Sequence, residues 1–214
     1  MKIVVLVKEV PDTYGDRKLD LETGLADRAA SERVLDEIGE RAIEAAISLK
    51  EGAPDAEVVL VSMGPDSASA GLRKGLAMGA DRAVHVLDAE LVGADLTLAA
   101  ETLAAAVRRE SPDLVIAGVL STDGTGAVVP AMVAEHLGWA HLTSMNSVAA
   151  ADGRASGVRA TDLGTATVSA ALLGTATRRV SSDGADPVLS TRLRGLPPGT
   201  PAAELVLHTA ALTA

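Results

Sequence analysis

The chain has 214 residues, a formal net charge of −10 and no cysteine. The acidic balance argues against a nucleic-acid partner, and one Trp, one Tyr and no Phe leave no platform for base stacking. The absence of cysteine excludes disulfides, thiolate metal sites and cysteine nucleophiles. No apolar run approaches the roughly 20 residues that span a bilayer, and the first residues do not form a signal peptide. We therefore expect a cytoplasmic protein without a transmembrane segment.

Strands and helices are predicted to alternate over the first two-thirds of the chain. Residues 2–8 form a strand, and the polar stretch 10–30 that follows is long for a connection, so it is either a hairpin or a functional loop. Apolar residues recur at helical spacing through residues 31–51, and Gly52 and Pro54 end this helix. Residues 57–62 form the second strand, a helix extends to Ala77, and residues 83–87 form the third strand.

The segment after the fourth strand is the most informative. Residues 93–109 predict an alanine-rich helix and residues 113–117 a strand buried on both faces; Gly118, Gly124 and Gly126 then let the backbone turn and approach a ligand. A helix follows over residues 130–137, and free N–H groups in such a turn favour a phosphate. A plain connection is the alternative, because the loop lacks the Lys-Ser or Lys-Thr of a P-loop, and Val129 replaces the third glycine of GxGxxG.

The remaining chain completes the predicted fold. A fifth strand is expected over residues 142–149, and residues 155–161 and 165–172 alternate as in a hairpin added at the sheet edge. The predicted fold class is α/β, Rossmann-like or similar to adenine-nucleotide alpha hydrolases, with a parallel five-stranded sheet and helices on both faces. We assign residues 1–150 to a nucleotide-binding domain, 151–180 to its added hairpin, and 181–214 to an extended, partner-contacting C-terminal arm.

Five segments carry a resemblance to a known family: VLVKEVPDT, VLDEIGERAIEAAISLKE, VVLVSMGP, LRKGLAMGADRAVHV and DLVIAGVLSTDGTGAVVPAMVAEHLGW. With them the chain resembles the small, or beta, subunit of electron-transfer flavoproteins. The resemblance implies a heterodimer whose large, or alpha, subunit carries most of a redox FAD, while the small subunit holds AMP. Electrons would pass from a flavin dehydrogenase to a membrane oxidoreductase or another acceptor.

The resemblance also implies a nucleotide pocket at the strand ends, where ligands bind in an open parallel sheet. Its residues are Leu6, Asp36, Glu37, Ile38, Gly39, Met63, Val119, Leu120, Ser121, Thr122, Asp123, Gly124, Thr125, Gly126, Ala127, Val128, Val129 and Pro130. The N–H groups of residues 122–127 would hold the phosphate, assisted by the hydroxyl of Ser121, Thr122 or Thr125.

Several of these positions have a plainer reading. Asp123 either orders the turn or meets a ribose hydroxyl. The alternative for Asp36, Glu37 and Glu40 is that they form the solvent-exposed face of an amphipathic helix. Leu6 and Met63 would pack on adenine or belong to the core.

No catalytic or metal-binding residue is assigned, because the four histidines lack ligand spacing. Redox chemistry would belong to the flavin. The Asn-Glu-Pro-Arg-Tyr segment of the family is replaced by TRRVSSDGADPVLSTRLRG, which keeps Arg178 and Arg179 and offers Val188 or Leu189 as the apolar anchor. Docking to dehydrogenases is therefore expected to be weak or altered.

Two alternatives to the AMP-binding carrier stay open. One is an electron-bifurcating subunit that holds its own FAD. The other is a stand-alone adenine-nucleotide-binding module that has lost its redox partner.

Overall fold

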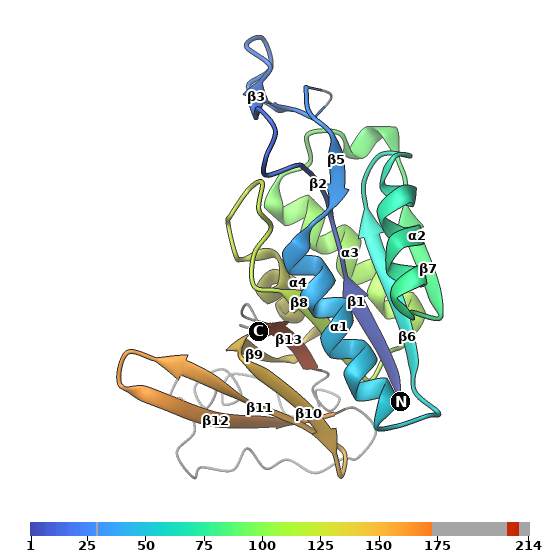
Figure 1. The fold of residues 1–214 in the computed structure, drawn as a ribbon, viewed down its shortest axis with the longest axis vertical. Coiled ribbons are helices and arrows are strands. Elements are labelled where there is room, and N and C mark those ends of the chain that lie inside the picture. Colours follow the sequence, from blue (N-terminus) through green and yellow to red (C-terminus); the bar gives the residue numbers. More distant parts are fainter. Residues whose placement is uncertain (29, 173–204, 210–214) are drawn as a thin grey trace.

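The computed structural model describes residues 1–28, 30–172 and 205–209. Its centre is a parallel sheet of six strands in the order β7-β6-β1-β8-β13-β9 (Figure 1). The strands are β1 (Lys2–Leu6), β6 (Glu57–Met63), β7 (Arg82–Val86), β8 (Leu114–Gly118), β9 (Ala140–Met145) and β13 (Leu205–Thr209).

The sheet corrects the predicted count of five strands. Four predicted strands are present and the fifth is present in its first part, but Leu205–Thr209, predicted to lie in an extended arm, form β13 between β8 and β9. The sequence of this short apolar segment does not predict that it pairs with both β8 and β9, which are distant from it in the chain. The rest of the predicted arm, with Val188 and Leu189, lies outside the described residues, as do Arg178 and Arg179 before it.

Helices cover both faces of the sheet, as predicted. On one face α1 (Glu37–Glu51) and α2 (Ala68–Met78) supply residues such as Ile43 and Leu72 to a core that includes Ile3, Leu60 and Ile116. On the other face α3 (Leu96–Glu110) and α4 (Val129–Leu137) pack against β1, β6 and β8. A short 3-10 helix, η1 (Ala89–Leu91), precedes α3. The strands of the sheet centre are therefore buried on both sides, which explains their continuous apolar sequences.

The first helix begins later than predicted. β5 (Arg33–Leu35) pairs antiparallel with β2 (Glu9–Pro11), so the apolar residues at 34 and 35 belong to a strand, and α1 starts only after Asp36. Between these two strands, β3 (Lys18–Leu19) and β4 (Ala26–Asp27) pair as a hairpin. The hairpin reading of the polar stretch is thus confirmed, and Figure 1 shows this hairpin projecting from one end of the molecule.

A second, separate sheet follows the central one. The predicted hairpin is present as β11 (Arg154–Thr161) and β12 (Gly164–Ala171), but β10 (Ser147–Ala151) joins it in an antiparallel three-stranded sheet rather than at the edge of the central sheet. The predicted fifth strand is therefore split, because β9 ends at Met145 and β10 begins at Ser147. Buried Ala155, Val168 and Ala170 join the core on the α1 side.

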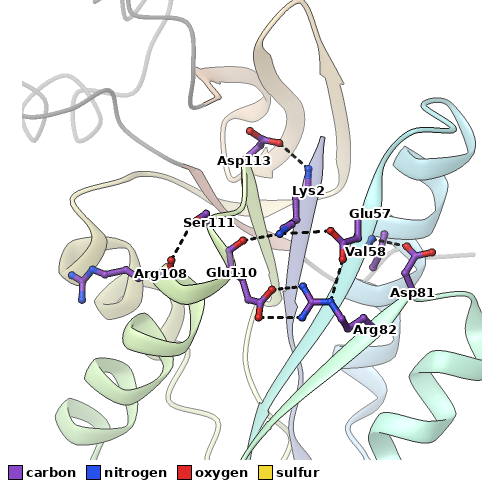
Figure 2. Close-up of polar contacts among 9 residues, drawn as sticks. All are labelled: Lys2, Glu57, Val58, Asp81, Arg82, Arg108, Glu110, Ser111 and Asp113. Atoms are coloured by element: carbon purple, nitrogen blue, oxygen red, sulfur yellow. Dashed lines mark hydrogen bonds and ion pairs between the residues drawn. The ribbon is translucent and has the colours of Figure 1, made fainter.

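Charged side chains tie the amino ends of the central strands together (Figure 2). Arg82 at the start of β7 donates to Glu57 and forms a double contact with Glu110, while the Lys2 backbone N–H donates to Asp113 at 2.7 Å. The Glu110 pKa lies below its usual value, chiefly because of the Arg82 hydrogen bonds. This network holds together the amino ends of the strands, opposite the glycine-rich loop that follows the carboxyl end of β8. Among the described residues, no helix is both long and apolar enough to cross a membrane.

Candidate functional site

The strand order places a switch point between β1 and β8. From β1 the chain moves outward through β6 to β7, and it then returns to form β8 on the other side of β1. Loops beyond the carboxyl ends of two such strands diverge and leave a crevice, which is where open α/β sheets bind ligands. Lys8 follows β1 at this crevice, and the glycine-rich loop, residues 119–128, follows β8. The structure therefore brings the predicted loop to the expected edge.

Asp36 connects the first helix to the glycine-rich loop. Its side chain caps α1 by accepting from Ile38 N at 3.0 Å, and its second oxygen accepts from Thr122 N at 2.8 Å. Asp36 is only 2% exposed, so the reading of this residue as part of a solvated face is wrong. Burial raises the Asp36 pKa, against the lowering effect of these two hydrogen bonds.

The neighbouring acidic residues of α1 have different surroundings. Glu37 is exposed on the first turn, as a solvated face requires. Glu40 is partly buried and accepts from Lys74 of α2. Among the described residues, Asp36 is the one of the three acidic residues that forms a hydrogen bond with the loop.

Asp123 is held between two cations. Lys8 Nζ lies 2.8 Å from Asp123 Oδ2, and Arg28 Nη2 lies 2.8 Å from the same oxygen. Asp123 also orders the turn, as one reading predicted, because its Oδ1 accepts from Gly124 N at 2.7 Å. Burial alone would raise the Asp123 pKa, but the hydrogen bond and charge of Lys8, with help from Ser121 and Arg28, bring it far below its usual value. The carboxylate is thus ionised throughout the physiological range.

Backbone hydrogen bonds already occupy part of the loop. Thr122 N donates to Asp36, Gly124 N to Asp123, and Thr125 N to the Ser121 carbonyl at 2.9 Å. In the part of the chain that the structure describes, the N–H groups of Asp123, Gly126 and Ala127 have no such acceptor. The Thr122 hydroxyl is buried and has no hydrogen-bond partner there either. Within the described residues, three N–H groups of the run 122–127 therefore remain without an acceptor.

The strained residues of the loop are not its glycines. Thr125 and Ala127 adopt φ values of 51° and 54°, whereas Gly124 and Gly126 do not have positive φ. An L-residue in this left-handed region costs roughly 1–3 kcal/mol, and such strain concentrates at ligand-binding segments. Ala127 is followed by Val128 in the right-handed region, and such a pair of successive conformations turns consecutive N–H groups toward one anion.

Gly118 has a packing role that its sequence did not reveal. A Cβ at this position would lie 2.7 Å from Ile38 Cγ2 and 3.2 Å from the Ile38 carbonyl oxygen. The absence of a side chain therefore lets the first turn of α1 approach the end of β8. This close approach is sufficient to require glycine at the end of β8.

The other predicted pocket residues differ in element and in burial. Leu6 is 8% exposed and belongs to the core on the α3 and α4 side, which supports its plainer reading. Met63 ends β6 and is partly buried, Gly39 is buried within α1, and Val119 and Leu120 are partly buried. Val128 is 40% exposed. Val129 and Pro130 form the first turn of α4.

Three basic residues of the site were missed by sequence reasoning. Besides Lys8 and Arg28, Arg17 donates through Nη1 to the Thr122 carbonyl. Arg17 and Arg28 flank the β3–β4 hairpin, so a segment distant in sequence folds back onto the loop. Lys8 could have been found from its place at the carboxyl end of the predicted strand 2–8, but the two arginines carried no local signal. Within the described ranges, no three His, Asp or Glu residues gather as metal ligands.

Comparison with known proteins gives a family match. Residues 23–204 match the model of the electron transfer flavoprotein domain. The chain is 45% identical over 175 residues to the "Electron transfer flavoprotein subunit beta" of Mycobacterium leprae, covering 79% of this chain and 66% of that protein. It is 35% identical to the protein of the same name from Syntrophomonas wolfei, covering 85% and 70% of the two chains.

A third relative has a different name. The chain is 37% identical to the "Caffeyl-CoA reductase-Etf complex subunit CarD" of Acetobacterium woodii, covering 72% of this chain and 59% of that protein. The chain thus spans slightly less than two thirds of the length of the mycobacterial relatives it matches.

Proposed function

Because the chain belongs to the electron transfer flavoprotein family, as a relative of its beta subunits, we propose that it is the small subunit of a cytoplasmic electron carrier. It binds AMP in the crevice between β1 and β8 and pairs with a large subunit that carries FAD. The carrier takes electrons from a flavin dehydrogenase and delivers them to an acceptor.

The observation that carries the nucleotide assignment is the strained loop at the switch point. Thr125 and Ala127 hold left-handed conformations, and the N–H groups of Asp123, Gly126 and Ala127 have no acceptor among the described residues. The buried Thr122 hydroxyl also lacks a partner there. A phosphate would satisfy the three N–H donors, and the energy of binding it offsets the strain. The residues present therefore fit a nucleotide phosphate.

The remaining pocket residues suit the rest of AMP. Met63 at the end of β6 and the partly buried Val119 and Leu120 offer apolar contact to the adenine ring. Asp36 and the first turn of α1, residues 37–39, hold the loop in place from the other side. The chain thus orients the nucleotide, while a bound flavin supplies the redox chemistry.

The hairpin end of the molecule suits contact with a large subunit. Tyr14 is 99% exposed, Leu21 98% and Leu19 64%. Leu25 packs beside Gly93, so exposed Val92 continues this apolar surface from the hairpin to the segment before α3. Side chains of this kind gathered at one end of a molecule mark an interaction surface. The double substitution Leu19→Asp and Leu21→Asp should abolish co-purification with the large subunit. The control Leu163→Asp, at an equally exposed leucine between β11 and β12, should preserve it.

The deciding experiment is to purify the chain together with its large subunit, denature the complex, and identify the released nucleotides by chromatography and mass spectrometry. One AMP and one FAD per complex is the expected result. Two FAD and no AMP would instead favour the electron-bifurcating alternative. Nucleotide without flavin or partner would leave a binding module, and no adenine nucleotide at all would refute the proposal.

A further inference from the structure

Two of the three cations that contact the glycine-rich loop form ion pairs with an aspartate of that loop. Asp123 accepts from Lys8 Nζ through both oxygens, at 2.9 and 2.8 Å, and from Arg28 Nη2 at 2.8 Å. Lys8 follows β1, Asp123 follows β8, and Arg28 arrives from the β3–β4 hairpin. The three side chains therefore meet beyond the carboxyl ends of β1 and β8, at the switch point where open α/β sheets bind ligands.

Burial differs sharply between the partners. The Asp123 side chain is 8% exposed, whereas those of Lys8 and Arg28 are 42% and 38% exposed. The carboxylate thus lies inside, and the two cations keep an open side toward solvent. An ammonium has three donors and a guanidinium five, so both cations have donors to spare for a second anion. By contrast, Arg17 donates to the Thr122 carbonyl and holds the loop backbone.

The loop also shows why an anion would compete with Asp123. The N–H groups of Gly126 and Ala127, which meet no acceptor among the described residues, lie three and four residues after Asp123 on the same loop. A phosphate held by these N–H groups carries more negative charge than a carboxylate. It would attract Lys8 and Arg28 more strongly than Asp123 does, and it would repel Asp123 itself.

We infer that Lys8 and Arg28 are the side chains that bind the phosphate of the nucleotide, and that Asp123 is an internal competitor that occupies them until the phosphate replaces it. The inference rests on the proposed function for the presence of an adenine nucleotide, and it adds the residues that select a phosphorylated ligand over a nucleoside. Asp123 keeps both cations in place and prevents their mutual repulsion while no nucleotide is bound.

The test compares AMP with adenosine, which lacks the phosphate. Dissociation constants are measured by calorimetry at fixed ionic strength on the 214-residue chain, freed of co-purified nucleotide. Lys8→Gln and Arg28→Gln should each weaken AMP binding about tenfold, as expected for loss of one charge-assisted hydrogen bond, and leave adenosine binding unchanged. Asp123→Asn should tighten AMP binding several-fold and leave adenosine binding unchanged.

A matched control removes a cation elsewhere. Lys74 pairs with Glu40 on the α1 and α2 surface, so Lys74→Gln should change neither constant. Amide hydrogen exchange of the unaltered chain, with and without AMP, provides a second test. Gly124 N–H, which donates to Asp123, should exchange faster with solvent deuterium once AMP has released that carboxylate.

The outcomes separate the two proposals. If the unaltered chain binds neither AMP nor adenosine, the proposed function fails and this inference fails with it. If AMP binds but its preference over adenosine is unchanged in both Gln variants, only this inference is overturned. Weaker AMP binding by a folded Asp123→Asn, or unchanged exchange at Gly124 on AMP binding, would show that Asp123 positions the cations and does not compete for them.

Discussion

Replacement of Asp36 by alanine should destabilise the protein by about 2–4 kcal/mol. Loss of the helix cap at Ile38 N costs about 1 kcal/mol, and leaving Thr122 N without its acceptor costs about 1–3 kcal/mol. Both hydrogen bonds end on the carboxylate of a residue that is only 2% exposed, so water cannot readily replace it. The free energy of unfolding is measured by urea denaturation with circular dichroism detection, because the slope also reports whether the folded state keeps its compactness.

A second capping aspartate provides the control. Asp95 caps α3 by accepting from Leu98 N at 2.8 Å, but it is exposed, and its side chain has no bond to a loop among the described residues. Asp95→Ala should therefore cost only about 1 kcal/mol. Asp36→Asn should fall between the two, since asparagine caps a helix well but presents an N–H₂ group to one of the two donors.

Amide exchange separates the bridge from the cap. The Thr122 N–H should exchange faster in both Asp36 variants and remain protected in Asp95→Ala, because only Asp36 accepts from it. The reasoning is refuted if Asp36→Ala costs no more than Asp95→Ala, or if exchange at Thr122 is the same in all of these proteins.

Three further changes test other parts of the site by the same unfolding assay. Ala127→Gly should stabilise the nucleotide-free protein by about 0.5–1 kcal/mol, since it relieves left-handed strain at an exposed residue; a loss of stability would contradict that backbone conformation. Gly118→Ala should cost about 1–3 kcal/mol because its Cβ meets Ile38, whereas the control Gly124→Ala has its nearest neighbour at 3.9 Å and should cost less than half as much; equal costs would count against the packing role. The lowered Asp123 pKa means that its ionised form stabilises the fold above the unfolded-state pKa, near 4, and that this contribution is lost as pH falls below it. The stability difference between the unaltered chain and Asp123→Asn should therefore shrink between pH 6 and pH 3, and a constant difference would refute the ion-pair assignment.

Local patterns in the sequence were sufficient for most individual elements. The apolar runs at β1, β6 and β8 and the helical spacing in α1 and α3 follow from the periodicity of buried faces, so these elements were placed to within a few residues. The same patterns misassigned Val34 and Leu35, which belong to β5, because an apolar pair before a helix has no property of its own that distinguishes a strand from an added helical turn.

Pairing between distant segments was beyond those patterns. The sequence of Leu205–Thr209 does not predict that this segment pairs with both β8 and β9. The sequence of residues 147–151 does not predict that they pair with β11 outside the central sheet. Register and partner choice are set by contacts among segments far apart in the sequence. They therefore emerge only when the chain is folded.

The sequence by itself determined the α/β class, the position of the glycine-rich loop after a buried strand, and the family resemblance, because each is written in contiguous residues. Only the tertiary structure decided the chemistry around that loop. Buried Asp36 accepts a hydrogen bond from Thr122 N, and Asp123 pairs with Lys8 and Arg28. Gly118 leaves the space that Ile38 occupies. The physical reason is that charge pairing and steric fit depend on distances of a few ångströms between groups that are separated by 80 to 115 positions in the chain.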